Sequence, residues 1–429
     1  MRIVMRYGKE GFPLDLPDDL DVTVIRKKAM PVLSDVRAAL EAAFANPVGS
    51  RSLQEEAKGC RNACILICDI TRPVPNGIVL PPLVRSLIEA GISPDSITVL
   101  VATGLHRPNE GEELREIVGD DWVLKTVNVA NHFARNAEDH VTLGITSDNI
   151  EASIDHRFVH ADLRIAVGLV EPHFMAGYSG GRKIVAPGVA HEKTIRTFHS
   201  ARILENCKAV NCVIDGNPLH GAQLEIIGMI GKCLAVNTVI DEERRLSFVN
   251  FGEIEASHLE AVAFVRPYAE VPMNKRFRTV VTSSAGYPLD KTYYQTVKGM
   301  VGALEILEPG GTLITVSSCS EGIGSAEYAE SQRNLIRLGP EKFLQEIMPK
   351  RYAAIDEWQS EMQVKAMKKG KVCLHVGGLS KDQRALTGVA LVESPAAAVL
   401  ESVKASGDRR VAVIPEGPYV IPLYVPDHG

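Results

Sequence analysis

Short continuous apolar runs alternate with stretches of helical periodicity along the first part of the chain. Residues 63–68 form an apolar run, residues 80–90 carry apolar side chains at helical spacing, and residues 96–102 form a second run rich in β-branched residues. Residues 110–118 are again helical in spacing, and residues 122–129 return to strand character. This alternation predicts βαβ units and a parallel sheet. Because the strands are apolar throughout, we expect helices on both faces of that sheet.

A second pattern of the same kind begins near residue 278, after a polar, proline-containing segment. Its expected strands are residues 279–283, 312–316, 372–376 and 411–414, and its expected helices include residues 291–307 and 348–368. At 429 residues the chain is too long for one ordinary core. We therefore expect two α/β domains with mainly parallel sheets, residues 1–270 and residues 271–429. The last ~20 residues contain four prolines and could return to the N-terminal domain.

Composition narrows the class of protein. Hydrophobic residues make up 45% of the chain and charged residues 23%, which is ordinary for a globular protein. The net charge of −6 and the pI near 6.1 argue against nucleic acid as a partner. No apolar run reaches the roughly 18 residues that span a bilayer, and the first residues lack the apolar core of a signal peptide. We therefore expect no membrane partner and a cytoplasmic location.

Polar residues directly follow three of the expected strands. Asp69 and Arg72 come after the first apolar run, His106 follows the second, and His173 follows a third run at residues 165–170. Ligands bind beyond the carboxyl ends of parallel strands, so three such ends together indicate one shared site. Arg72 is well placed there to bind a carboxylate. Taken singly, the aspartate could cap a turn and either histidine could be an ordinary turn residue.

The segment from residue 171 to residue 183 is the most informative part of the chain. It reads Glu-Pro-His-Phe-Met-Ala-Gly-Tyr-Ser-Gly-Gly-Arg-Lys. Glycine lets the backbone come close to an anion, and successive N–H groups can cradle that anion. The segment therefore fits either a phosphate cradle or a covalent site at Lys183. The pattern alone does not distinguish the two.

Two further groups of polar residues adjoin expected helices. His199 lies at the margin of the apolar face of a helix expected at residues 191–204. It is either a satisfied, half-buried histidine or a ligand aimed at whatever Lys183 holds. The second group shares one helix face by its i, i+3, i+4, i+7 spacing: Lys291, Tyr294, Gln295 and Lys298. Such a face is ordinarily solvated, but this one follows a strand and a turn and could supply donors to a ligand.

Together these motifs resemble the nickel-dependent lactate racemase family. The matching segments, in chain order, are Asp69-x-Thr71-Arg72-Pro73, His106-Arg107-Pro108, Glu171-Pro172-His173, Gly177-Tyr178-Ser179-Gly180-Gly181-Arg182-Lys183, His199 and Tyr294-Gln295-x-x-Lys298. They run from residue 69 to residue 298 and join both expected domains. The resemblance implies an active site in the cleft between those domains.

The resemblance also implies a cofactor, the nickel-pincer nucleotide, which is a pyridinium-3,5-bisthiocarboxylic acid mononucleotide that holds nickel. Lys183 would carry this cofactor covalently through a thioamide, and His199 would be a ligand of the nickel. The residues expected to seat the nucleotide are Asp69, Thr71, Tyr178, Ser179, Gly180, Gly181 and Arg182. The residues expected to orient the substrate carboxylate are Arg72, Tyr294, Gln295 and Lys298. His106 and His173 would be the acid–base pair.

By this resemblance the chain is a racemase or epimerase of 2-hydroxy acids. The reaction would use reversible hydride transfer to the cofactor, with one histidine on each side of the substrate to exchange the hydroxyl proton. Ile70 stands where lactate racemases are expected to have histidine, so the substrate is lactate or a larger 2-hydroxy or sugar acid. Expected partners are that acid and the enzymes that build the cofactor, and a homo-oligomer also fits.

Two other functions fit parts of the same sequence. A zinc hydrolase would gather His106, His173 and His199 around a metal-bound water. It would leave Lys183 and the glycine-rich turn without a role. A non-catalytic module would use the same turn to bind a nucleotide or a phosphosugar, and in that case neither histidine would be needed for ligand binding.

Overall fold

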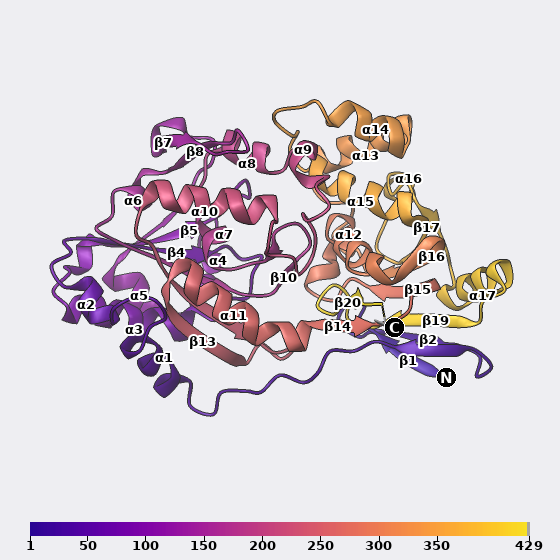
Figure 1. Cartoon of the computed structure of the whole chain (residues 1–429), viewed down its shortest axis with the longest axis horizontal. Coiled ribbons are helices and arrows are strands. Elements are labelled where there is room, and N and C mark those ends of the chain that lie inside the picture. Colours follow the sequence, from indigo (N-terminus) through magenta and orange to yellow (C-terminus); the bar gives the residue numbers. More distant parts are fainter. Residues whose placement is uncertain (427–429) are drawn as a thin grey trace. The chain divides into compact units, whose positions relative to one another are not determined.

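The structure is a computed structural model, and it describes residues 1–426 (Figure 1). The chain forms two compact units. Unit 1 contains residues 1–28, residues 199–205 and the chain from Pro267 onward. Unit 2 contains residues 29–198 and 206–266.

Unit 2 is built on a six-stranded sheet with the order β13-β12-β9-β4-β5-β6. Its strands are β4 (Ala63–Cys68), β5 (Ile97–Ala102), β6 (Asn128–Asn131), β9 (Leu163–Leu169), β12 (Leu234–Ile240) and β13 (Leu246–Glu253). Every pairing is parallel except that of β12 with β13. Two hairpins accompany the sheet: β7 (His140–Ile145) with β8 (Glu151–Asp155), and β10 (Pro172–His173) with β11 (Gly177–Tyr178). The expected, mainly parallel sheet is confirmed.

Helices pack on both faces of this sheet (Figure 1). One face is covered by α1 (Val36–Ala45), α2 (Leu53–Ala57), α3 (Asn76–Glu89), α4 (Glu112–Val118) and α5 (Asp121–Thr126), whose apolar side chains share one buried core with Ile65, Val99 and Val167. Strand neighbours point to opposite faces, so Gly168 faces away from that core. There it lies against Ile184 of α7 (Arg182–Val185). The other helices of this unit are α6 (His156–Val159), α8 (Glu192–Phe198), α10 (Pro218–Ile230) and most of α11 (Ile254–Ala269).

The strand expected at residues 122–129 is wrong over most of its length. Helix α5 occupies this segment, and β6 begins only at Asn128. The side chain of Asp120 caps α5, because its carboxylate accepts a hydrogen bond of 2.9 Å from the backbone N–H of Val123. Asp121 adds a negative charge to the first turn, where the helix dipole favours one. The capping signal outweighs the strand preference of the apolar residues that follow.

Unit 1 contains a second six-stranded sheet, with the order β18-β17-β16-β15-β19-β3 and parallel pairing throughout. Its strands are β3 (Asp21–Val24), β15 (Phe277–Ser283), β16 (Leu307–Ser317), β17 (Gly370–Val376), β18 (Ala390–Leu391) and β19 (Arg410–Ile414). Two small sheets add β1 (Arg2–Met5) with β2 (Phe12–Asp15) and β14 (Glu270–Met273) with β20 (Ile421–Tyr424). The helices are α9 (Ala201–Leu204), α12 (Tyr293–Gly302), α13 (Ala326–Leu338), α14 (Pro340–Ile347), α15 (Glu357–Lys369), α16 (Lys381–Ala385) and α17 (Pro395–Ser406).

The units differ from the expected domains, residues 1–270 and 271–429, at the N-terminus and at residues 199–205. Strand β3 pairs in parallel with β19, with Val22 opposite Val411, so residues 1–28 belong to unit 1. Strand β20 pairs with β14 of the same unit, so the chain near Ile421 does not return to unit 2. Long-range strand pairing of this kind leaves no local signal in the sequence.

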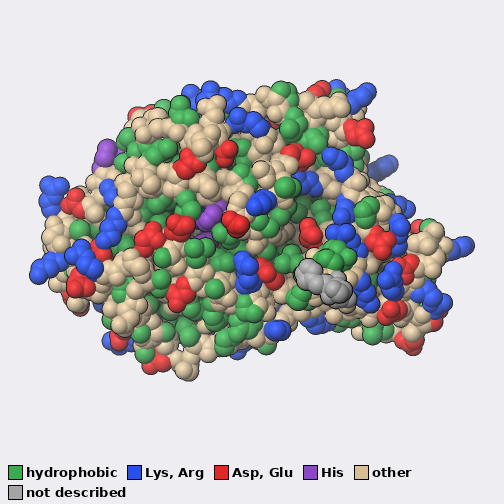
Figure 2. All heavy atoms as spheres, in the orientation of Figure 1, with side chains coloured by type: hydrophobic (Ala, Val, Ile, Leu, Met, Phe, Trp, Pro, Cys, Tyr) green, Lys and Arg blue, Asp and Glu red, His purple; other side chains and the backbone are tan. Residues whose placement is uncertain are grey.

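The surface agrees with the balanced composition. On the face shown in Figure 2, acidic and basic side chains are interspersed. Among the described residues, no helix combines the length and the apolar character needed to cross a bilayer.

Candidate active site

The polar residues that follow β4, β5 and β9 lie close together in unit 2. The three strands are adjacent and parallel, in the order β9-β4-β5, so their carboxyl ends lie on the same edge of the sheet. Five side chains at these ends are linked to one another in pairs, and we call them the strand-end cluster: Asp69, Thr71, Arg72, His106 and Glu171.

The centre of this cluster is a carboxylate–imidazole pair. Asp69 Oδ2 lies 2.6 Å from Nδ1 of His106, and Asp69 Oδ1 accepts a hydrogen bond of 2.6 Å from the hydroxyl of Thr71. The side chain of Asp69 is 7% exposed, whereas that of His106 is 60% exposed. Burial raises the pKa of Asp69, but the hydrogen bond and charge of His106, with Thr71 and Arg72, hold it below its ordinary value. The aspartate is therefore a carboxylate that orients an accessible imidazole.

Arg72 and Glu171 form the second pair of the cluster, through Nη1 and Oε1. Their side chains are 22% and 25% exposed. The pair joins the ends of β4 and β9, two adjacent strands. Arg72 thus already binds a carboxylate through one of its nitrogen atoms.

His173 lies in the short hairpin formed by β10 and β11. Its Nδ1 accepts hydrogen bonds from the backbone N–H groups of Met175, at 3.2 Å, and Ala176, at 3.1 Å. The ring stacks on Phe174, with centroids 5.1 Å apart, and the residue is buried. Nδ1 of His106 thus contacts a carboxylate, whereas Nδ1 of His173 contacts two backbone N–H groups.

The glycine-rich turn that follows has a conformation that only glycine accommodates. Gly180 has a φ of +83°, and a Cβ there would lie 2.6 Å from the side chain of Val170. Ser179 pins the turn to β9, because its hydroxyl donates a hydrogen bond of 2.7 Å to the carbonyl of Leu169. The turn leads into α7, which carries Lys183 on its first turn. The backbone therefore passes close to the sheet just before this lysine.

Lys183 lies near the end of β4. It is partly exposed, and its charge acts together with that of Arg72 on the Cys68 thiol. Burial is the main reason that the pKa of Cys68 is raised to about 11, and the two cations oppose that rise. The amine of Lys183 is therefore within electrostatic reach of Cys68, the last residue of β4 and the neighbour of Asp69 in the chain.

Arg182, the neighbour of Lys183, is completely buried. Its Nη1 lies 2.7 Å from Nε2 of His258, and its Nη2 donates to the carbonyl of Ala176 at 3.1 Å. Its Nε has no hydrogen-bond partner among the described residues. Burial lowers the pKa of Arg182 to about 9, and the charge of Glu255 only partly opposes that change. A buried guanidinium with an unused donor is suited to an anionic group.

His199 belongs to unit 1, and the continuous helix expected at residues 191–204 is wrong. The helix ends at Phe198 and restarts at Ala201, because the intervening Ser200 has extended backbone angles. His199 lies at this break, and its ring lies against that of Trp358 with centroids 4.6 Å apart. Trp358 in turn donates a hydrogen bond of 3.0 Å from Nε1 to the hydroxyl of Tyr294.

The expected polar helix face is shorter in the structure than in the sequence pattern. Lys291 precedes α12 and forms an ion pair of 2.5 Å with Glu321, so it leaves the face. Tyr294, Gln295 and Lys298 remain on α12. Burial and the nearby Asp356 raise the pKa of Tyr294. Gln295 presents a buried Oε1 that accepts no hydrogen bond from any described residue, so this acceptor is available to a ligand.

Beside this face lies a second polar group, which is entirely buried. We call it the amide–tyrosine network, and its members are Tyr293, Tyr328, Gln332, Ser360 and Gln363. The hydroxyl of Tyr293 donates to Gln363 Oε1 at 3.0 Å, and Gln332 Nε2 donates to the same oxygen at 2.9 Å. These bonds join α12, α13 and α15 and contain no charged side chain.

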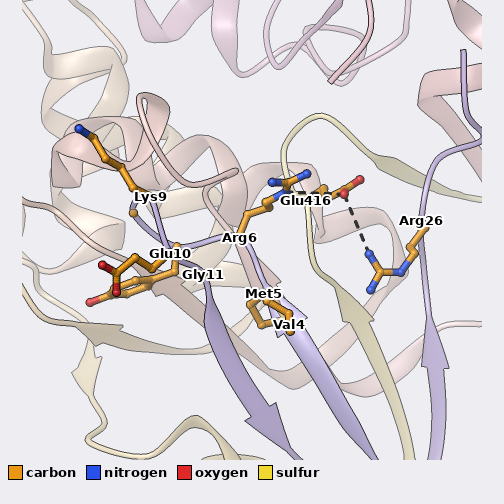
Figure 3. A pocket seen from close by; sticks show the side chains of 10 residues that line it. Val4, Met5, Arg6, Lys9, Glu10, Gly11, Arg26 and Glu416 are labelled. Carbon is orange, nitrogen blue, oxygen red and sulfur yellow. Dashed lines mark ion pairs between the residues drawn. The ribbon is translucent and has the colours of Figure 1, made fainter. Parts of the chain in front are cut away.

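Unit 1 also contains a pocket of about 260 Å³ (Figure 3). It is lined by residues 4–11, Arg26 and Glu416. Glu416 lies 3.8 Å from Arg6 and 4.0 Å from Arg26, so it partly neutralises the cations of the pocket. None of the residues that line it is an expected site residue.

Sequence reasoning missed two contacts at these sites. The motif that contains Glu171 does not indicate a role for its side chain, yet Glu171 forms the ion pair with Arg72. Trp358 contacts the ring of His199 from a helix 159 residues further along the chain, a separation that no local pattern reveals. Among the described residues, no group of three or more His, Cys, Asp or Glu side chains is arranged to hold a metal ion.

Comparisons with known proteins identify the class of protein to which this fold and these sites belong. A family model described as the lactate racemase N-terminal domain matches residues 7–211, and one described as the lactate racemase C-terminal domain matches residues 273–422. The chain is 31% identical to a lactate racemase of Thermoanaerobacterium thermosaccharolyticum, over 98% of both chains. It is 33% identical to a lactate racemase of Lactiplantibacillus plantarum, over 75% of this chain and 76% of the relative.

Solved structures agree with this result. The lactate racemase apoprotein from T. thermosaccharolyticum superposes with a TM-score of 0.91 at 28% identity, covering 98% of this chain and 100% of that one. A protein from Thermotoga maritima, at 18% identity and a TM-score of 0.67, shares the fold. The protein is thus an enzyme of the isomerase class. It belongs to the lactate racemase family.

Proposed function

We propose that the enzyme racemises or epimerises a 2-hydroxy acid, lactate or a larger 2-hydroxy or sugar acid, with a nickel-pincer nucleotide attached to Lys183. The observation that carries the proposal is the pair of Asp69 and His106 at the strand ends, next in the chain to Cys68, whose thiol the charge of Lys183 reaches. Family membership agrees with it, because both named relatives are lactate racemases. The zinc hydrolase and the non-catalytic module are not favoured by these relatives.

Proton exchange with the substrate hydroxyl is the first task of the site. Asp69 holds the Nδ1 side of His106, and in this proposal Nε2 of the exposed ring takes the hydroxyl proton and returns it. The negative charge of Asp69 stabilises the imidazolium that forms. An unperturbed histidine titrates near neutrality, which suits a proton transfer that must run in both directions.

The residues around Lys183 fit an attached anionic nucleotide. The glycine-rich turn brings the backbone close to the lysine, and the buried Arg182 has an unused Nε–H. The other residues proposed to bind the nucleotide are Tyr178, Ser179, Gly180, Gly181, Asp69 and Thr71. When bound, such a pyridinium cofactor supplies reversible acceptance of a hydride. His199, whose ring is held against Trp358, is the proposed protein ligand of nickel.

The substrate carboxylate requires cationic and amide partners. In this proposal Arg72 binds it in competition with Glu171, while Lys298 supplies a second cation and Tyr294 lies alongside. The unpartnered Oε1 of Gln295 can accept a hydrogen bond from a hydroxyl group of the substrate.

Ile70 bears on the choice between lactate and a larger acid, because it stands where lactate racemases are expected to have histidine. Its side chain packs against the buried core on one face of the unit 2 sheet, and its backbone N–H donates to Asn109 Oδ1 at 3.3 Å. Ile70 therefore offers no polar group to a substrate. We include in the proposal a cytoplasmic location, dependence on the enzymes that build the cofactor, and self-association into a homo-oligomer.

The test is to produce the enzyme together with the cofactor-building enzymes of a lactate racemase host. Intact-mass and peptide mass spectrometry should show an added mass at Lys183 and about one nickel per chain. Chiral chromatography should then show interconversion of the enantiomers of lactate, malate, phenyllactate or an aldonic acid. Lys183→Ala should abolish both, whereas the exposed Lys193→Ala should change neither. Full activity of a sample with unmodified Lys183 would overturn the proposal.

A further inference from the structure

Residues 199–205 form a short segment of unit 1 that lies, in the chain, between two stretches of unit 2. The segment begins with His199, the proposed nickel ligand, and contains the four-residue helix α9. So short a helix is not stable by itself, and its position therefore depends on what it packs against. Ala201 shares a buried core with Leu335 of α13 and Val364 of α15. This core holds the middle of the segment.

Helix α15 contacts the segment at both ends. At the first end the ring of His199 lies against Trp358, and at the other end Lys365 Nζ donates a hydrogen bond to the carbonyl of Leu204. Lys365 Nζ also lies 3.7 Å from Oε1 of Glu205. Trp358 and Lys365 are seven residues apart, so they lie on the same face of α15. One helix face therefore holds the chain both before and after α9.

A third residue of this face, Glu361, is buried and hydrogen-bonds to Glu205. A carboxylate only accepts hydrogen bonds, so one of these two carboxyl groups must carry a hydrogen. Burial raises the pKa of Glu361 well above its ordinary value, and the charge of Lys365 only partly opposes that rise. The charges of Glu205 and Glu357 add to it. The hydrogen therefore belongs to Glu361, which donates to Glu205.

Three side chains together form what we call the α9 anchor: Lys365, Glu205 and Glu361. With the hydrogen on Glu361, the anchor contains one ammonium and one carboxylate, and its charges balance. Burial lowers the pKa of Lys365, and the charge of Glu205 opposes that change. Glu357 and the exposed Lys368 are the other charged groups that act on the anchor. Charged groups that bond to one another in this way are buried at the least cost.

We infer, resting on the proposed function, that the α9 anchor positions His199 for nickel. Trp358 contacts the ring of His199, and the anchor fixes the backbone at the other end of α9. Lys365 and Glu361 are thus positioning residues, because they act through the backbone of the segment. A ligand on a poorly held backbone binds its metal less tightly, so the anchor contributes to the retention of nickel.

The first test uses the full chain without cofactor and does not depend on activity. Lys365→Met combined with Glu205→Gln removes one charge of each sign, so no unpaired charge stays buried. The carbonyl of Leu204 loses its donor, and hydrogen exchange followed by mass spectrometry should show the amides of α9 exchanging about tenfold faster. Lys368→Met changes an exposed lysine of the same helix and should exchange like the wild type. Exchange at the wild-type rate in the double variant would overturn the inference.

Two variants of Glu361 test the hydrogen assigned to it. The amide of Glu361→Gln can still donate to Glu205, whereas the thioether of Glu361→Met cannot. The first variant should keep the wild-type exchange rate, and the second should exchange about tenfold faster in α9. The infrared spectrum should contain a protonated carboxyl band that Glu361→Gln lacks and that Glu341→Gln, a change at an exposed position, retains. Equal exchange in the two Glu361 variants, or a band that Glu361→Gln retains, would overturn the assignment.

The second readout is nickel in enzyme made together with the cofactor-building enzymes. Transfer of nickel to a chelator should be about 10- to 100-fold faster in the double variant than in the wild type or Lys368→Met, as for other residues that orient a metal ligand. Faster exchange in α9 with unchanged nickel transfer would show that the anchor is only structural, and it would refute the inference. If the wild-type enzyme carries no nickel, the proposed function fails, while the exchange and infrared measurements still decide whether the anchor holds α9.

Discussion

The strand-end cluster of unit 2 and the amide–tyrosine network of unit 1 are both dense sets of polar side chains, but they differ in the charge and the exposure of those side chains. The cluster consists mainly of charged or titratable groups, and His106, its central imidazole, is well exposed. The network consists of neutral amides and hydroxyls, and every member is buried. The cluster is positioned by three strand ends, whereas the network lies between helices α12, α13 and α15.

The difference shows what each arrangement can do. Exposed titratable groups can exchange protons with a ligand, and a buried carboxylate beside them fixes their orientation. Neutral groups that hydrogen-bond mainly to one another cannot exchange protons, but they fix the relative positions of the helices that carry them. We therefore expect changes in the cluster to affect activity and changes in the network to affect stability.

The largest expected effect is that of Asp69→Asn. The amide oxygen can still accept a hydrogen bond, but it carries no negative charge and therefore cannot stabilise the imidazolium. Racemisation should fall by about 10² to 10⁴-fold, as when the aspartate of a catalytic triad is exchanged for asparagine. The measurement is kcat by chiral chromatography, with thermal unfolding recorded alongside.

Asp162→Asn is the matched control for this prediction. Asp162 also pairs with a basic side chain, Arg61 at 3.2 Å, in the same unit but away from the strand ends. This variant should racemise at the wild-type rate. If Asp69→Asn remains as active as Asp162→Asn, the cluster has only a structural role and the contrast with the network disappears.

Tyr293→Phe tests the network, and for this variant we expect a change in stability and not in activity. The single O–H of Tyr293 is within hydrogen-bond distance of two acceptors, Gln363 Oε1 at 3.0 Å and the carbonyl of Thr387 at 2.8 Å. Both acceptors keep another donor, because Gln332 also reaches Gln363 Oε1 and Gln363 Nε2 also reaches Thr387. The expected loss of stability is therefore only about 1 kcal/mol.

Calorimetry should show this loss as a Tm lower by roughly 2–4 °C for the transition of unit 1. The exposed Tyr287→Phe should leave the Tm unchanged. Racemisation by Tyr293→Phe should stay at the wild-type level below that transition. A large loss of kcat with an unchanged Tm would show that the network takes part in catalysis.

Much of the cluster could be predicted from the sequence, because its signals are local. Continuous apolar runs correctly predicted β4, β5 and β15, and parallel pairing then predicted that the polar residues after β4 and β5 would meet. The errors were local as well. The cap at Asp120 converted an expected strand into α5, and the extended Ser200 broke the helix around His199.

The network could not be predicted in this way. Helix α15 buries Gln359, Ser360 and Gln363 together with Trp358, although its sequence is polar enough for a solvated surface helix. Burial of these side chains depends on hydrogen-bond partners far along the chain, such as Tyr293. The return of residues 1–28 to unit 1 has the same cause, since β3 finds its partner in β19. Sequence patterns report which face of an element is apolar, but not which distant residues satisfy a buried amide.

The smallest expected effect is that of Glu171→Gln, which tests the second pair of the strand-end cluster. Glu171 occupies the guanidinium of Arg72, the proposed partner of the substrate carboxylate. Both side chains are partly exposed, so the ion pair contributes little to stability, about 1 kcal/mol or less. Removing the charge of Glu171 ends its competition with the substrate, and KM should fall by up to about tenfold while kcat changes little. Initial rates at varied substrate concentration measure both constants.

The isosteric change keeps Arg72 in place, and Arg72→Lys, which loses the forked geometry, should raise KM instead. A higher KM for Glu171→Gln would mean that Glu171 orients Arg72 for the substrate rather than competing with it.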